Sequence, residues 1–200
     1  MSGAKFTIGI DLGTTHSAVS IARLEVEGAR PEVLRVPQLV AAGAIEAREL
    51  LPSFLYLPHA SEGPQALPWD AERAFVVGEH ARARGVDAPA RLVSSAKSWL
   101  SHSGVDRHVG TLAIGAPEDV EKISPVEASW RILEHLAEAF DQRFSGEGLR
   151  LVDQDVVLTV PASFDASARE LTVEAALAAG IDKLTLLEEP QAALYAWIDA

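Results

Sequence analysis

Short apolar runs lie at both ends of the chain, and a longer stretch with helical spacing lies between them. Residues 8–11 and 18–22 are two apolar segments separated by Gly-Thr-Thr, a pattern typical of two strands joined by a tight turn. A third strand is expected over residues 32–36, after the turn at 28–31. The C-terminal part predicts alternating elements: a strand at 155–160, a helix at 166–179, a strand at 183–187 and a helix at 189–198. Strands alternating with helices favour an α/β core.

The longest predicted helix begins after Ser124 and reaches about Arg143. Ser124 suits the N-cap, Pro125 the first helical position, and Glu127 the third position of a capping box. Apolar residues then recur every three or four positions, at Val126, Trp130, Leu133, Ala137 and Phe140. For the helix at 166–179, the N-cap is either Ser163 or Asp165, and Gly180 is the C-terminal stop.

The segment between Pro37 and Pro117 has a different character, with most of the prolines, short apolar runs and polar turns. It predicts an inserted, irregular subdomain. The elements expected within it are a strand at 51–57, a loop at 58–70, a short strand at 75–78, a helix at 79–84 and a helical turn or two at 94–100.

Composition narrows the functional classes. The 200 residues are 48% hydrophobic, enough for a substantial core, and the net charge of −12 argues against a nucleic-acid or anionic-membrane surface. The chain has no cysteine, no apolar stretch long enough for a membrane span and no secretory leader pattern, so we expect a cytoplasmic protein. The six histidines lack metal-ligand spacing, and surface placement is expected for them.

The most informative motif is the turn that follows the first apolar segment. Asp11 ends that segment, and Gly13 allows the backbone to approach a ligand that a Cβ would keep away. Thr14 and Thr15 add N–H groups and hydroxyls suited to phosphate oxygens, and Asp11 could hold the hydrated metal ion that accompanies phosphates. The alternative is an ordinary hairpin with a buried or capping aspartate.

Three separated segments, residues 8–17, 157–169 and 186–195, together resemble the DnaK-type heat-shock chaperones of about seventy kilodaltons. The second segment contains Thr-Val-Pro-Ala-Ser-Phe and the third contains Glu-Glu-Pro-Gln-Ala-Ala. The resemblance covers nearly the whole chain and is to the first lobe of the family's ATPase domain. It implies a ribonuclease-H-like half of an actin-type fold. Residues 1–37 and 122–200 would form its core subdomain, and residues 38–121 an inserted α+β subdomain.

The resemblance also implies roles for individual residues. An ungapped register from Val77-Gly78 places the family's essential lysine at Lys97, which would stabilise the γ-phosphate of ATP and position the attacking water. Asp11 and Glu189 would order Mg²⁺ through its waters, with Glu189 also in the catalytic group, and Gly13, Thr14 and Thr15 would hold phosphates. The plainer alternatives are a solvated Lys97 and a Glu189 that serves only the helix dipole.

Two further positions match the family's interdomain relay. Pro161 and Arg169 would pass the nucleotide state, ATP or ADP, to a substrate-binding domain. Departures from the family pattern occur at His16, Ser98, Val173 and residues 194–197, which makes the chain a divergent member.

For the intact protein, the resemblance implies an ATP-hydrolysing chaperone for unfolded or apolar peptide segments, with a J-domain co-chaperone and a nucleotide-exchange factor as partners. The second lobe and the peptide-binding domain are expected outside these 200 residues, so the fragment alone is expected to be inactive. Two alternatives remain: a bacterial actin-like filament protein, which also suits Glu-Glu-Pro, and a regulatory module that binds nucleotide without turnover.

Overall fold

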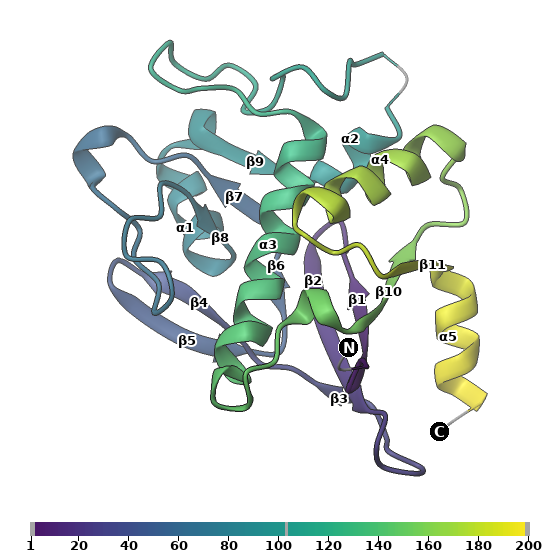
Figure 1. The fold of residues 1–200 in the computed structure, drawn as a ribbon. Helices are drawn as coiled ribbons and strands as arrows, with labels where there is room; N and C mark the ends of the chain where they lie inside the picture. Colours follow the sequence, from purple (N-terminus) through teal and green to yellow (C-terminus); the bar gives the residue numbers. More distant parts are fainter. Residues whose placement is uncertain (1–2, 103, 199–200) are drawn as a thin grey trace.

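The chain forms a mixed α/β structure, described by a computed structural model that covers residues 3–102 and 104–198 (Figure 1). Its main sheet has the strand order β11-β10-β1-β2-β3, and β6 pairs with the start of β2. The strands of this sheet are β1 (Phe6–Asp11), β2 (His16–Arg23), β3 (Glu32–Val33), β6 (Leu51–Pro52), β10 (Asp155–Val160) and β11 (Leu184–Glu188). The α/β class predicted from the sequence is confirmed.

Three strands of the main sheet run in the same direction. β1 pairs with β10 in parallel, with Asp11 opposite Thr159, and β10 pairs with β11 in parallel, with Val160 opposite Glu188. The carboxyl ends of these three strands therefore lie at one edge of the sheet. β2 and β3 extend the sheet on the other side of β1 through antiparallel pairing.

Helices α3 (Pro125–Arg143) and α4 (Ala166–Ala178) pack against each other, and α3 crosses the face of the sheet (Figure 1). On that face β1 contributes Phe6, Ile8 and Ile10, which are buried in one cluster with residues of both helices. The Phe6 and Phe140 rings meet edge to face at 5.7 Å. Helix α5 (Glu189–Ile198) follows β11 at the rim of the sheet and buries none of its residues.

The ends of α3 and α4 follow the predicted signals in most respects. Ser124 Oγ accepts the N–H of Glu127 at 3.0 Å, but the Glu127 carboxylate accepts from Arg131 at 2.6 Å. Only half of the predicted capping box therefore forms. Of the two candidates for the α4 N-cap, Asp165 fills the position, and its Oδ1 accepts the N–H of Ala168 at 2.8 Å.

The middle of the chain is more regular than predicted, since two small sheets form there. A two-stranded sheet pairs β4 with β5, and a three-stranded sheet has the order β8-β7-β9. The elements are β4 (Val36–Ala41), β5 (Ala44–Arg48), β7 (Phe54–Tyr56), β8 (Val76–Val77), β9 (Leu92–Ser94), α1 (Glu79–Asp87) and α2 (Ala96–Leu100). Leu55, Val77 and Val93 join the core of the main sheet, whereas Leu39, Tyr56 and Val76 belong to a second, smaller apolar cluster.

Several predicted bounds in this region are wrong. The strand expected at 32–36 ends at Val33, and Val36 begins the hairpin of β4 and β5, which the sequence analysis missed. Pro37 is tolerated in β4 because that strand pairs only with β5. The strand expected at 51–57 divides at Ser53, because β6 pairs in the main sheet and β7 in the small one.

The other elements of the middle segment differ in length. The strand expected at 75–78 is reduced to β8, and the helix expected at 79–84 continues to Asp87 as α1. The helical turns expected at 94–100 begin only at Ala96, because residues 92–94 form β9 and pair with β7. None of the helices in the described part of the chain is long and apolar enough to cross a bilayer.

Two histidines that were expected at the surface are buried, His80 on α1 and His135 on α3. His135 is 1% exposed, and its Nε2 donates to the carbonyl oxygen of Pro37 at 3.0 Å, which anchors β4 to α3. Burial lowers the pKa of His135 to about 3, and the charge of Arg73 adds to the shift. His135 is therefore a neutral structural residue at ordinary pH.

Candidate functional site

The turn between β1 and β2 is so tight that it has no room for a side chain at Gly13. A Cβ on Gly13 would lie 2.1 Å from the His16 carbonyl oxygen, so the turn itself excludes any side chain there. Gly13 was predicted from the sequence to allow the approach of a ligand, and the contact with His16 is a reason for glycine that needs no ligand. Thr14 and Thr15 are exposed, and the Thr15 carbonyl accepts the N–H of Ser53 at 2.9 Å. This bond ties the turn to the junction of β6 and β7.

Asp11 lies at the carboxyl end of β1 and is exposed, so it is not a buried aspartate. Its Oδ1 accepts a hydrogen bond from Thr159 Oγ1 at 2.9 Å. A hollow of about 230 Å³ lies beside this pair on the sheet face, lined in part by Gly9, Leu187 and Ala192. Thr159 was not predicted from the sequence, because its position opposite Asp11 depends on the parallel register of β1 and β10.

Lys97 and Glu189, which are 92 positions apart, form an ion pair. Lys97 lies on α2 with a side chain that is 6% exposed, and its Nζ donates to Oε1 of Glu189 at the start of α5. Lys97 is therefore not a solvated lysine. The sequence proposed both residues for one site, and the structure brings them into direct contact.

Arg169 and Pro161 lie near the carboxyl ends of β10 and β11. The Arg169 guanidinium donates to Glu188 Oε1 at 2.7 Å and to the Phe164 carbonyl at 3.1 Å. Pro161 directly follows β10, whose last residue is opposite Glu188. The sequence analysis missed Glu188, although its position beside Glu189 was a signal.

The doublet of Glu188 and Glu189 thus holds two cations from different helices. Glu188 pairs with Arg169 of α4, and Glu189 pairs with Lys97 of α2. Asp11 shares their sheet edge but contacts Thr159 instead. In the described residues, no three histidine, aspartate or glutamate side chains are arranged to hold a metal ion directly.

Comparisons with known proteins agree with this geometry. The family described as Hsp70 protein matches residues 71–197, more than half of the chain. The chaperone protein HscA of Cronobacter sakazakii is 33% identical over 208 residues, and the HscA homologue of Methylococcus capsulatus is also 33% identical over 208 residues. The HscA homologue of Pseudomonas aeruginosa is 34% identical over 207 residues. Each alignment covers 96% of this chain and 28% of the relative.

These similarities define the class of protein. The chain belongs to the Hsp70 family, as its motifs predicted. It spans about 28% of the length of the curated relatives that it matches.

Proposed function

We propose that the chain is the first lobe of the nucleotide-binding domain of an ATP-hydrolysing chaperone, which binds ATP or ADP with Mg²⁺. The observation that carries this proposal is the gathering of parallel strand ends at one sheet edge. Asp11 and the Gly13–Thr15 turn lie at the same edge as the ion pair of Lys97 and Glu189.

Each group has a chemical role in this proposal. The turn offers backbone N–H groups and threonine hydroxyls to phosphate oxygens. Asp11 and Glu189 hold Mg²⁺ through its waters, which suits an ion that gives up its hydration shell reluctantly. Lys97 stabilises charge on the γ-phosphate and positions the attacking water, so catalysis depends on placement and charge. Its present partner, Glu189, would have to release it for that contact.

We infer the remaining features from the same family assignment. The fold is a ribonuclease-H-like half of an actin-type ATPase, with 1–37 and 122–200 as its core subdomain and 38–121 as the insertion. The meander of β1, β2 and β3, continued by two parallel strands, supports this assignment. Pro161 and Arg169 relay the nucleotide state. The intact protein binds apolar peptide segments in the cytoplasm, with a J-domain co-chaperone and a nucleotide-exchange factor.

The decisive test uses the protein extended to the full length of its relatives. Lys97→Ala should lower ATP turnover by a factor of about 100 or more and leave ATP binding nearly unchanged, because the lysine acts on transition-state charge. Lys122→Ala removes the same charge at an exposed position and should have no effect. Single-turnover hydrolysis and equilibrium binding of ATP are measured side by side.

Three results would contradict the proposal in different ways. Turnover of Lys97→Ala within about twofold of wild type would remove Lys97 from the mechanism. A wild-type protein that binds ATP without hydrolysing it would be a regulatory module. Nucleotide-dependent sedimentation would favour a filament protein. An Asp11→Asn variant that folds normally should need about tenfold more Mg²⁺ for turnover, because the amide lacks the negative charge that holds the hydrated ion.

A further inference from the structure

A hollow of about 320 Å³ opens at the end of the main sheet opposite to the candidate nucleotide site. β1 begins at this hollow with Phe6 and reaches the other edge with Asp11, roughly 17 Å away at the usual rise per residue. The walls are the turn between β2 and β3 and the C-terminal end of α3, at the base of the molecule in Figure 1. The proposed ATPase mechanism makes no use of this place.

Three arginines line the hollow, Arg23, Arg30 and Arg143. The Arg23 guanidinium lies 4.7 Å from the centre of the Phe6 ring, and that of Arg143 lies 5.1 Å from the centre of the Phe144 ring. Cation–π stacking of this kind orients a planar guanidinium and leaves its N–H groups available for an anion.

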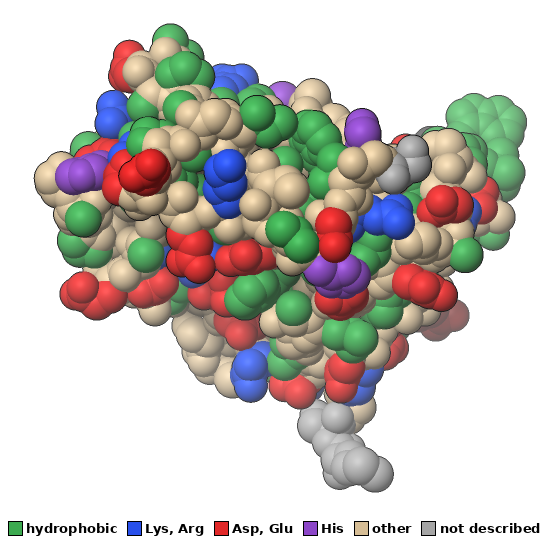
Figure 2. All heavy atoms as spheres, turned by 90° about the horizontal axis from the view of Figure 1, so that it is seen from above, with side chains coloured by type: hydrophobic (Ala, Val, Ile, Leu, Met, Phe, Trp, Pro, Cys, Tyr) green, Lys and Arg blue, Asp and Glu red, His purple; other side chains and the backbone are tan. Residues whose placement is uncertain are grey.

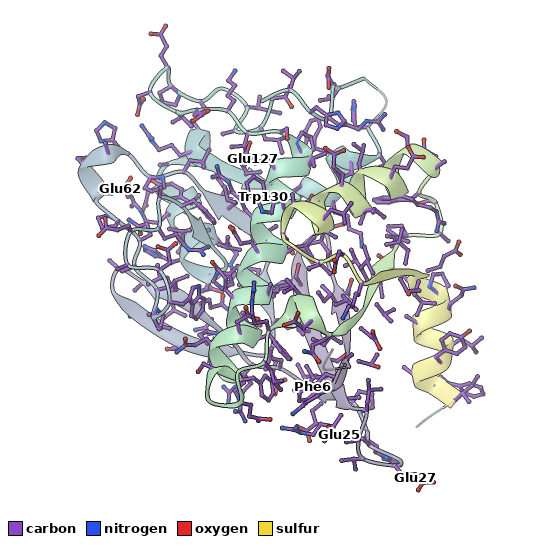
Figure 3. All side chains as sticks on the ribbon, in the orientation of Figure 1. Phe6, Glu25, Glu27, Glu62, Glu127 and Trp130 are labelled. Atoms are coloured by element: carbon purple, nitrogen blue, oxygen red, sulfur yellow. The ribbon has the colours of Figure 1, made fainter. Side chains whose placement is uncertain are left out.

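The charges around the hollow are only partly neutralised. Arg23 is bonded to Glu147 at 3.1 Å, and Glu32 is the one carboxylate in the lining. Arg30 and Arg143 take part in no ion pair with any residue that the structure describes. Figure 3 shows Phe6 within the base of the molecule, Glu25 below it and Glu27 further out at the tip of the hairpin. In a chain with a net charge of −12, two guanidinium groups without an ion-pair partner among the described residues thus share the hollow with one carboxylate, Glu32.

Apart from the arginines and Glu32, the residues that line the hollow are apolar, so its ligand should carry an apolar group as well as a charge. Ile21 and Val26 present hydrocarbon surface to the hollow, whereas the Phe6 and Phe144 rings in its wall are buried and carry the stacked guanidinium groups. A lone phosphate would leave that surface facing water, and a nucleic acid would be repelled by the net charge of the chain. A peptide segment with an apolar side chain between two carboxylates would match both the apolar residues and the arginines of the lining.

We propose that this hollow binds an acidic peptide segment of a partner protein. One apolar side chain enters the hollow, and flanking carboxylates accept hydrogen bonds from Arg30 and Arg143. Guanidinium and carboxylate groups match in a bidentate geometry, which gives specificity as well as attraction. Because the arginines are exposed, the interaction weakens as salt is added.

Nuclear magnetic resonance titration of the 200-residue chain tests the proposal, with a short capped peptide containing Glu-Leu-Glu as the probe. Saturable shifts are expected at the amides of Ile21, Ala29 and Phe144, with a dissociation constant on the order of 100 μM. The combined variant Arg30→Gln and Arg143→Gln should bind at least about tenfold more weakly. A matched control, Arg48→Gln with Arg82→Gln, makes the same charge change on the exposed face of β5 and α1 and should bind within about twofold of wild type.

Two further probes decide the chemistry. The peptide containing Gln-Leu-Gln should bind at least about fivefold more weakly, because neutral amides lose the charge-assisted bonds. Inorganic phosphate should not reproduce the shifts at peptide concentration. The proposal is overturned if the acidic peptide produces no saturable shifts, if the glutamine peptide binds equally well, or if phosphate binds as tightly as the peptide. It is also overturned if both double variants bind alike.

Discussion

Gly13 is constrained by the chain itself, because a Cβ there would stand 2.1 Å from the His16 carbonyl oxygen. Gly13→Ala should therefore lower the free energy of unfolding by about 2 kcal/mol or more, as backbone strain in a fixed turn does. Urea denaturation measures the change. Gly146→Ala is the matched control, since nothing lies within 4 Å of a Cβ at that position, and it should stay within about 0.5 kcal/mol of wild type.

This comparison separates two reasons for the same residue. A Gly13→Ala variant that is as stable as wild type but loses nucleotide binding would show that the turn can open. Gly13 would then serve the approach of a ligand, as the sequence analysis expected. Loss of stability in the absence of nucleotide supports the contact with His16 as the cause.

His135 should make the stability of the protein depend on pH. Its pKa is about 3 in the folded chain and about 6.5 when unfolded, because burial disfavours the charged ring. The unfolded chain therefore binds more protons between these values. The contribution of the neutral ring to stability is complete above pH 6.5 and is lost as the pH falls towards 3, by up to about 1.4 kcal/mol per pH unit.

The measurement is the midpoint of urea unfolding at pH 7 and at pH 5, compared between wild type and His135→Gln. The glutamine can still donate to the Pro37 carbonyl but does not titrate, so its midpoint should fall less on acidification. His102→Gln changes an exposed ring and should keep the wild-type pH dependence. Equal pH dependence of all three proteins would contradict a buried neutral His135.

At the scale of elements, α2 and α5 are joined by the ion pair of Lys97 and Glu189, whose two members differ in burial. The Lys97 side chain is 6% exposed and that of Glu189 is 43% exposed. Glu189→Gln should lower the free energy of unfolding by about 1 to 2 kcal/mol, because it leaves a buried ammonium without its carboxylate. Lys97→Met should cost less or stabilise the fold, because the buried charge is removed.

Thermal and urea unfolding measure which variant, Glu189→Gln or Lys97→Met, loses more stability. Glu147→Gln breaks the exposed pair with Arg23 and serves as the control, with an expected change below about 0.5 kcal/mol. If Lys97→Met proves the more destabilising of the pair, the ammonium is well solvated in solution and the ion pair is a surface contact.

The elements also show what the sequence could predict. α3, β10 and α5 have the predicted bounds because their signals are local: a Ser-Pro cap, an apolar run stopped by proline, and a Glu-Pro start. The hairpin of β4 and β5 was missed because β4 contains Pro37, a residue that usually argues against a strand. The division of β6 and β7 at Ser53 depends on which sheet each half meets, and no local pattern encodes that choice.

The candidate site, too, has some features that the sequence could predict and others that it could not. Motifs placed Asp11 at a strand end and Glu189 at a helix start, where the structure has them. The bond from Thr159 to Asp11 and the pairing of Arg169 with Glu188 required the parallel register of the sheet. Contacts between distant segments of this kind follow from packing, so they could only be found in the structure.

At the scale of the whole molecule, one side of the sheet is far more open than the other. α3 and α4 cover the face that holds Phe6, Ile8 and Ile10, whereas α5 stands at the rim with Tyr195 and Trp197 exposed (Figure 1). Figure 2, the view from above, shows acidic, basic and apolar side chains interspersed, without a continuous basic surface.

The exposure of the candidate nucleotide site determines the affinity that we expect these 200 residues to have for nucleotide. Asp11, Thr14 and Thr15 are exposed, so a bound Mg-ATP would be contacted from one side only. Contacts on a single wall leave little to offset an association cost of several kcal/mol. We therefore expect a dissociation constant weaker than about 100 μM, equivalent to roughly −5.5 kcal/mol. Isothermal titration with Mg-ATP measures it, and Asp11→Asn should weaken whatever binding remains. Micromolar binding by the wild-type chain would mean that these residues already hold a complete nucleotide site, and the assignment as a single lobe would then fail.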